Sequence, residues 1–155
     1  MAFEQLLQEL ATREQRALAM GGEAKLAQRK AEGLLNARER IARLFDEGSF
    51  IESGMLAVSN RPEDKASTPA DGKIAGFGRI EGREAGVLAN DFTVKGASSA
   101  AINIKKLKHM KVTTKKRGIP MVFLGESTGA RMPDVMGAAS IGSKDDPIEY
   151  QRLRE

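Results

Sequence analysis

The apolar positions at the start of the chain repeat with the spacing of a helix. Residues 2–32 contain no proline, and apolar residues recur there as on one helix face, beginning with Phe3, Leu6, Leu7 and Leu10. Gly21-Gly22 interrupts this pattern before it resumes. We therefore predict an N-terminal helical arm over residues 1–32, made of two segments. An amphipathic arm of this kind is more often a docking element than a catalytic one.

The next apolar pattern predicts a third helix over residues 36–46. Asn36 is a favourable N-cap, and Gly48 follows as a stop signal. The face expected to be buried carries Ile41, Leu44 and Phe45. Residues 50–53 then read as a brief extended segment.

A β-hairpin is predicted over residues 73–79 and 83–90, with Glu81-Gly82 at its turn. Before it, residues 59–71 are polar, contain two prolines and show no apolar periodicity, which is typical of a surface loop. After it, residues 91–94 are predicted to continue as a strand.

Two loops of small residues connect predicted strands and helices in the second half of the chain. Residues 121–124 predict a short buried strand that runs into the small residues 125–131. An earlier loop at 95–101 leads into a helix predicted over 98–117, with a core face of Ala100, Ile104, Leu107 and Met110. The order strand, small loop, helix, strand, small loop predicts right-handed crossovers and some parallel sheet, so the fold class is α/β with mixed α+β character.

Composition limits the classes of protein that the chain can belong to. Its 155 residues, 41% hydrophobic and 30% charged, predict a soluble globular domain without a membrane span. The absence of cysteine excludes disulfides, thiolate metal sites and cysteine nucleophiles, and a single histidine, His109, disfavours histidine metal sites, so we expect no metal. The N-terminus lacks a secretory pattern, and we expect a cytoplasmic location.

Positive charge is concentrated in residues 105–117, which contain six lysines and one arginine but no acid. This run fits the solvated face of a helix, an anion site for pyrophosphate and a ribose phosphate, or a nucleic-acid contact. No stacking motif accompanies it, so nucleic acid is the weakest of these alternatives. His109 lies within the run and is expected at the surface.

The side chains of the second small loop do not form a recognisable catalytic set. Ser127 lacks the first glycine of a nucleophile elbow, and Glu126 and Asp134 do not define a carboxylate dyad. Main-chain chemistry remains possible, because residues 96–99 and 127–130 can each offer N–H groups to a developing oxyanion.

Three blocks of sequence resemble one family of enzymes. They are residues 33–41 with 44–52, residues 76–83 with 90–96, and the Ser-Thr-Gly-Ala-Arg-Met block at 127–132. In this order and spacing they resemble the carboxyltransferase (beta) subunit of biotin-dependent acyl-CoA carboxylases, of the propionyl-CoA and methylcrotonyl-CoA carboxylase type. The resemblance implies a partial crotonase-like (ClpP/crotonase) fold of ββα units over residues 33–155, and transfer of a carboxyl group between carboxybiotin and the alpha carbon of an acyl-CoA.

The resemblance also implies site residues and partners. Backbone amides at Thr128 and Gly129, joined by those at Ala97 and Ser98, would hold the thioester enolate. Substrate-binding positions would be Gly96, Ala130 and Arg131. Acyl-CoA would be the substrate, and biotin would arrive on a separate carrier. The implied partners are the C-terminal half of the carboxyltransferase, a biotin carboxylase or carrier subunit, and further copies in a homo-oligomer.

Three positions depart from the family pattern: Ala97 and Thr128 stand where glycine is usual, and Pro133 stands where glutamine is usual. Residues 145–155 read as the start of another helix, and the pattern stops there, so we expect a fragment of a longer subunit that is inactive alone. The alternative is a catalytically silent assembly module of a carboxylase or decarboxylase complex.

Overall fold

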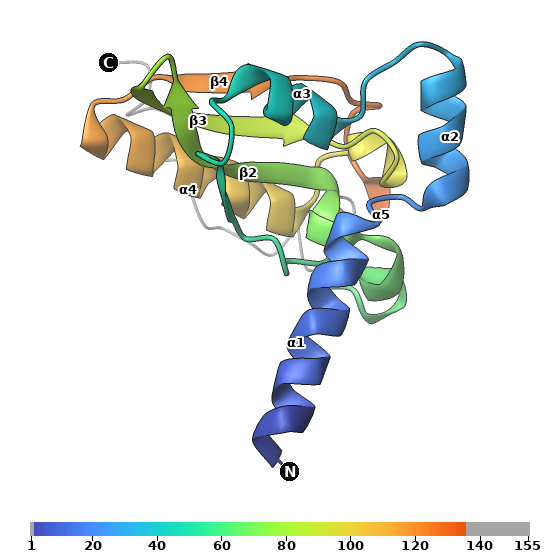
Figure 1. The fold of residues 1–155 in the computed structure, drawn as a ribbon. Helices are drawn as coiled ribbons and strands as arrows, with labels where there is room; N and C mark the ends of the chain where they lie inside the picture. The colour runs from blue at the N-terminus through green and yellow to red at the C-terminus, as the bar shows by residue number, and fades with distance from the viewer. Residues whose placement is uncertain (1, 136–155) are drawn as a thin grey trace.

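The computed structural model describes residues 2–135 (Figure 1). The helices are α1 (Ala2–Leu18), α2 (Glu23–Ala31), α3 (Ala37–Leu44), α4 (Ala101–Arg117) and α5 (Met132–Val135). The strands are β1 (Ile51–Ser53), β2 (Lys73–Ile80), β3 (Arg83–Asn90) and β4 (Met121–Leu124). Three short 3-10 helices complete the list: η1 (Pro62–Ser67), η2 (Pro69–Gly72) and η3 (Lys95–Ala97).

The strands form one sheet in the order β1-β2-β3-β4. β2 and β3 are the predicted hairpin, paired antiparallel around Glu81-Gly82. β4 pairs parallel with β3, and the connection between them is α4. Parallel neighbours require such a crossover, which places the ends of β3 and β4 at the same edge of the sheet. The predicted strand–helix–strand order with partly parallel pairing is therefore confirmed.

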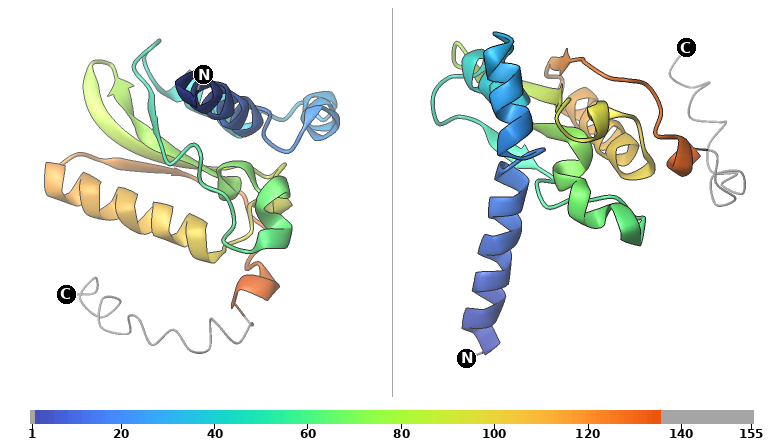
Figure 2. Two further views of the ribbon diagram at one scale, coloured as in Figure 1. Left: turned by 90° about the horizontal axis from the view of Figure 1, so that it is seen from below. Right: turned by 90° about the vertical axis from the view of Figure 1, so that its right-hand side faces the viewer.

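The helices α3 and α4 cover opposite faces of the sheet. Successive residues of a strand point to opposite sides, so neighbouring residues of β2 and β3 pack against different helices. One face packs Ile74 and Val87 against Ile41 of α3. The other packs Ala75 and Leu88 against Met110 of α4, and Figure 2 shows α4 running along that face. α3 begins with the predicted cap, since the Asn36 side chain accepts from the Glu39 N–H at 3.0 Å.

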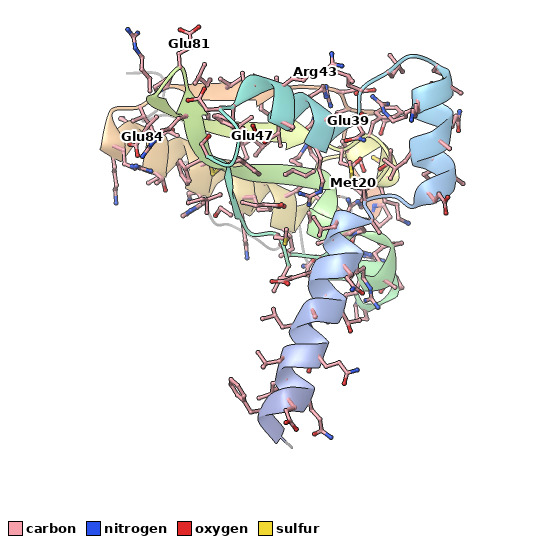
Figure 3. All side chains as sticks on the ribbon, viewed as in Figure 1. Met20, Glu39, Arg43, Glu47, Glu81 and Glu84 are labelled. Carbon is pink, nitrogen blue, oxygen red and sulfur yellow. The ribbon has the colours of Figure 1, made fainter. Side chains whose placement is uncertain are left out.

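The helix α1 projects away from the sheet (Figure 1), and the predicted break at Gly21-Gly22 separates it from α2. Met20, labelled in Figure 3, lies where α1 meets the body and is only 6% exposed. By contrast, the apolar stripe of α1 is exposed, with Phe3 at 71% and Leu6 at 62%. The arm therefore forms as two helices, while its role in docking stays a prediction.

Residues 59–71 are only in part the surface loop that the sequence predicts. Residues 60–67 are exposed or half-buried, but Ser59 is only 1% exposed, and Thr68 and Asp71 are fully buried, with 0% exposure. Polar composition suggested solvent contact, whereas these polar groups find hydrogen-bond partners inside the protein: the Thr68 hydroxyl accepts from the Ser59 N–H at 3.0 Å. The prediction was wrong for residues 68–71.

Residues 91–94 do not continue the hairpin strand. They form a turn in which the Val94 N–H donates to the Asp91 carbonyl at 3.1 Å. The Asp91 carboxylate also accepts from the Thr93 N–H at 3.0 Å, a local bond that competes with strand pairing. Of the residues that suggested a strand, Thr93 and Val94 are buried by the turn, whereas Phe92 is 37% exposed.

Two predictions of burial were also wrong. Phe123 in β4 is 53% exposed, because β4 lies at the edge of the sheet within the described residues. Ile104 of α4 is 41% exposed, while Met110 and Ala100 are fully buried as predicted. The helix predicted over 145–155 lies outside the described residues.

Candidate functional site

The two small-residue loops lie side by side at the end of the parallel strands. Three backbone hydrogen bonds join them: Thr128 N–H to Gly96 O at 3.0 Å, Ser99 N–H to Gly129 O at 2.7 Å, and Arg131 N–H to Ser99 O at 2.7 Å. The Ser127 hydroxyl adds a bond to the Ala97 carbonyl at 3.1 Å. The topology thus brings together residues that lie about thirty positions apart in the sequence.

The first loop has an unusual backbone. Lys95, Gly96 and Ala97 all adopt left-handed conformations, with φ values of 49°, 59° and 50°. Only glycine does so without strain, and non-glycine residues in this region are held there by their surroundings. A Cβ built on Gly96 would lie 2.6 Å from Cγ2 of Thr128, so glycine is also required for the second loop to approach.

Each of the four predicted oxyanion amides donates to an acceptor within the chain. Ala97 N–H bonds Val94 O at 2.8 Å, and Ser98 N–H bonds Lys95 O at 3.2 Å. Thr128 N–H bonds Gly96 O, and Gly129 N–H bonds the Ser127 hydroxyl at 3.1 Å. A donor that stabilises an oxyanion must point its N–H at that oxygen. Their role therefore stays a prediction that requires some of these bonds to be exchanged.

Gly129 meets this requirement most easily. It is exposed, and its N–H is held by a rotatable hydroxyl instead of a backbone carbonyl. The Ala97 N–H is the least accessible, because Ala97 has 0% exposure and its bond to Val94 closes a tight turn. Among the predicted substrate-binding residues, Gly96 is half-buried, and Ala130 is exposed and bridges to Ser99.

Arg131, the third predicted substrate-binding residue, has a buried side chain. Its Nη1 lies 2.7 Å from Oδ1 of Asp71, and its exposed fraction is 6%. Asp71 itself is fully buried, and burial raises the pKa of its carboxyl, against the opposing effect of the Arg131 guanidinium. Contact with substrate through Arg131 stays a prediction.

A buried polar cluster beneath the loops escaped sequence reasoning. It consists of Asp71, Lys73, Asn103 and Arg131. Burial lowers the pKa of Lys73, whose Nζ donates to the Ala97 carbonyl at 3.2 Å. The only sequence signal was a charged pair around Gly72 immediately before an apolar strand, and the polar composition of residues 59–71 concealed it.

The second loop is also anchored to the N-terminal helices. Arg29 of α2 makes a bidentate ion pair with Glu126, at 2.8 Å to each carboxylate oxygen. Arg40 of α3 lies 3.4 Å from the same carboxylate, and the Arg29 guanidinium stacks 5.6 Å from the ring of Phe92. Glu126 is therefore an anchor for the start of the loop.

The lysine run lies on α4, and His109 is exposed there, as predicted. Lys106 is an exception: it is 9% exposed, and its Nζ donates to the Ala70 carbonyl at 2.9 Å. Within residues 2–135, no group of three or more acidic or histidine side chains is arranged to hold a metal ion. In the same part of the chain, no helix is long and apolar enough to span a membrane.

Comparison with known proteins identifies the class to which this fold and these loops belong. Residues 28–144 match the family model of the carboxyl transferase domain. The propionyl-CoA carboxylase beta chain of Cereibacter sphaeroides is 37% identical over 151 residues, which are 95% of this chain and 29% of that protein. Methylmalonyl-CoA decarboxylase subunit alpha of Veillonella parvula is 35% identical over 123 residues, which are 77% of this chain and 24% of that protein.

The solved structure of transcarboxylase 12S with methylmalonyl-coenzyme A bound, described as a hexamer, is similar with a TM-score of 0.80 and 33% identity. The match covers 89% of this chain and 27% of that one. The chain belongs to the carboxyl transferase domain family and has part of its crotonase-like fold. It spans about a quarter of the length of these relatives.

Proposed function

We propose that this chain is part of an acyl-CoA carboxyltransferase subunit, which transfers a carboxyl group between carboxybiotin and the alpha carbon of an acyl-CoA. The observation that carries this proposal is the junction of the two small-residue loops at the end of parallel strands β3 and β4. The family membership supports it, since the relatives are named for acting on propionyl-CoA and methylmalonyl-CoA.

The chemistry needs donors for a developing negative charge. Adding or removing a carboxyl group at the alpha carbon passes through an enolate, whose charge lies on the thioester oxygen. A single well-placed N–H donor to such an oxygen contributes about 3 kcal/mol of transition-state stabilisation. We assign this role first to the Gly129 N–H, because it is exposed and is held by the Ser127 hydroxyl alone.

Carboxybiotin enters this proposal as a second substrate carried by a separate protein or domain. The two loops supply part of the acyl-CoA side, and we assign none of the described residues to biotin. The proposal therefore includes the remainder of the carboxyltransferase, a biotin carboxylase or carrier subunit, and further copies of the subunit as partners. Residues 33–155 would be the part of the crotonase-like domain, with residues 1–32 as its arm.

A catalytically silent assembly module is the second candidate function. Two observations favour it: the four predicted amides already have acceptors in the chain, and the apolar stripe of α1 is exposed. In this case the chain would bind other subunits and would leave acyl-CoA to them.

Calorimetric titration of the chain with propionyl-CoA separates these functions. Saturable binding that is clearly tighter than binding of free CoA supports the carboxyltransferase, because the acyl thioester then contributes. A folded chain that self-associates but gives no heat with propionyl-CoA supports the assembly module. An oligonucleotide is the control for the lysine run on α4, and strongly salt-dependent binding to it would contradict both candidates.

A further inference from the structure

The buried polar cluster beneath the two loops has no part in the proposed chemistry, and yet it contains three charged side chains. Asp71, Lys73 and Arg131 are 0%, 3% and 6% exposed. Charged residues are rarely buried to this extent unless they are paired and hydrogen-bonded, because removing them from water is costly. The contacts of these side chains therefore indicate which parts of the backbone the cluster holds in place.

Lys73 contacts the first loop directly. Its Nζ donates to the Ala97 carbonyl at 3.2 Å and to Oδ1 of Asn90 at 3.0 Å. The Ala97 carbonyl belongs to the same planar peptide group as the Ser98 N–H. Holding this carbonyl therefore fixes the direction in which the Ser98 N–H points.

Asp71 joins the second loop to the start of α4. Its Oδ1 pairs with Arg131 at 2.7 Å, and its Oδ2 accepts from the Asn103 N–H at 2.9 Å. The Asn103 side chain in turn donates to the Ser98 carbonyl at 2.9 Å. Asp71 thus connects the end of one loop with the peptide that follows Ser98 in the other.

The backbone around Asp71 is strained. Ala70 and Asp71 adopt left-handed conformations with φ values of 50° and 46°, and they are followed by Gly72. This turn packs against the left-handed turn at residues 95–97, since a Cβ built on Gly72 would lie 3.6 Å from the Cα of Ala97. Strained residues of this kind concentrate at functional sites, where the surroundings enforce a geometry.

We propose that Asp71 and Lys73 are positioning residues that hold residues 96–98 and 127–131 in one fixed arrangement. Lys73, on one side of Gly72, holds the first loop through the Ala97 carbonyl, and Asp71, on the other side, holds the second loop through Arg131. The N–H groups of the two loops therefore keep a fixed orientation relative to each other. This inference rests on the proposed function, because only that function requires the N–H groups of the two loops to act together. A cluster that merely stabilised the fold would affect all parts of the chain equally.

The test measures amide hydrogen exchange by NMR in the ligand-free chain, comparing Lys73→Met with the wild type. We expect exchange at Ser98 and Thr128 to become about tenfold faster, as for the loss of a hydrogen bond, while Val87 and Leu88 in the hairpin change much less. Arg38→Met is the matched control, because it also removes a partly buried cation, and the hydrogen bonds of Arg38 go to Glu52 and Ala17, outside both loops and residues 70–73. It should leave the loop amides close to wild type.

Three results would overturn the inference: equal acceleration in the loops and the hairpin, no acceleration in the loops, or the same loop response in Arg38→Met. If Lys73→Met does not fold, Asp71→Asn tests the same arrangement from the second loop, because it removes the charge that pairs with Arg131 at 2.7 Å and keeps the size of the side chain. Lys73→Arg should restore slow exchange if a cationic donor is what the loop needs. The exchange experiment uses no substrate. A failure of propionyl-CoA to bind would therefore contradict the proposed function and leave the positioning role of Asp71 and Lys73 unaffected.

Discussion

Gly96 is the residue on which the approach of the two loops depends most. Its φ of 59° lies in the left-handed region, and its missing Cβ leaves room for the Thr128 side chain. The Gly96 carbonyl also accepts the Thr128 N–H at 3.0 Å. Gly96 therefore provides the backbone conformation, the space and the hydrogen-bond acceptor that the contact between the loops requires.

Substituting Gly96 by alanine should separate the loops. The added Cβ would lie 2.6 Å from Cγ2 of Thr128, a clash that costs about 1–3 kcal/mol in addition to the backbone strain. The matched control is Gly82→Ala, because Gly82 has a φ of 77° but no neighbour within 4 Å of the built Cβ. Chemical denaturation should show a larger loss of unfolding free energy for Gly96→Ala than for Gly82→Ala.

A second substitution tests whether the clash is the cause. Thr128→Ala removes the two nearest atoms, Cγ2 at 2.6 Å and Oγ1 at 2.7 Å, and leaves only the Thr128 Cβ at 3.2 Å, so it should recover most of the stability that the clash in Gly96→Ala costs. Equal costs for Gly96→Ala and Gly82→Ala, or no recovery in the double variant, would show that the loops are not in contact as described.

Lys106 gives a pH-dependent contribution to stability. Burial lowers its pKa from 10.5 to about 8, with Glu52 and Asp71 opposing this and Arg38 and Lys73 adding to it. Between these two pKa values the unfolded chain binds more protons than the folded chain, so the unfolding free energy should rise as pH increases from about 8 to 10.5. A shift of this size corresponds to about 3 kcal/mol.

The measurement is urea denaturation at several pH values for the wild type and Lys106→Met. The difference in unfolding free energy between the two should change in favour of the wild type across this range, since methionine does not titrate. Other lysines titrate in both proteins and cancel in the comparison. A difference that is flat with pH would mean that Lys106 is not buried in the folded protein.

At the scale of elements, the arm and the body differ in how their apolar residues are used. The stripe of α1 is exposed, with Leu6 at 62% and Leu7 at 50%, whereas Met20 at the end of the arm is 6% exposed. Replacing Leu6 and Leu7 together by glutamine should change the unfolding free energy by less than about 0.5 kcal/mol, because helix propensity is kept and little apolar burial is lost.

Met20→Ala is the comparison within the same arm, and it should cost about 2–3 kcal/mol because it leaves a cavity in the core. Both variants are read by thermal or chemical denaturation at low protein concentration. If the glutamine variant were strongly destabilised, and more so at high concentration, the stripe would be covered by a second copy of the chain in solution.

The elements that sequence predicted correctly are those with a local cause. The cap of α3 at Asn36, the turn at Glu81-Gly82 and the end of α4 at Arg117, which is followed by a left-handed Gly118, each depend on residues close together in the chain. The failures are non-local. The burial of Thr68 and Asp71 depends on hydrogen-bond partners outside their own turn, Ser59 for Thr68 and Arg131 for Asp71. The apolar periodicity of a short segment does not indicate such contacts.

For the candidate site, too, the local features could be predicted from the sequence and the long-range contacts could not. The two loops could be found from their small residues and their place after strands, and parallel pairing could then place them at one edge of the sheet. The ion pair between Asp71 and Arg131 joins residues sixty positions apart, and no local pattern in the sequence indicates it. The acceptors of the loop amides could not be predicted either, because they depend on backbone angles at Lys95 and Ala97.

At the scale of the whole molecule, the sheet and its two covering helices form a support for the loops. α4 connects the parallel strands, so the same helix that buries one face of the sheet also brings the second loop beside the first. α2 and α3 hold Glu126 at the start of that loop through Arg29 and Arg40. Since the chain spans about a quarter of the length of its relatives, we expect that this chain alone would bind acyl-CoA without turning it over, and that turnover would need the partners proposed above.

The most direct test of the account is to map propionyl-CoA binding onto the backbone amides by NMR titration. The account predicts the largest chemical-shift changes at Gly129 and its neighbours in residues 127–130, with smaller changes at residues 96–98 across the junction. Saturation of these shifts at a common affinity would show that the two loops respond as one site. Shifts confined to the lysines of α4, or none in either loop, would contradict the claim that this junction binds the acyl thioester.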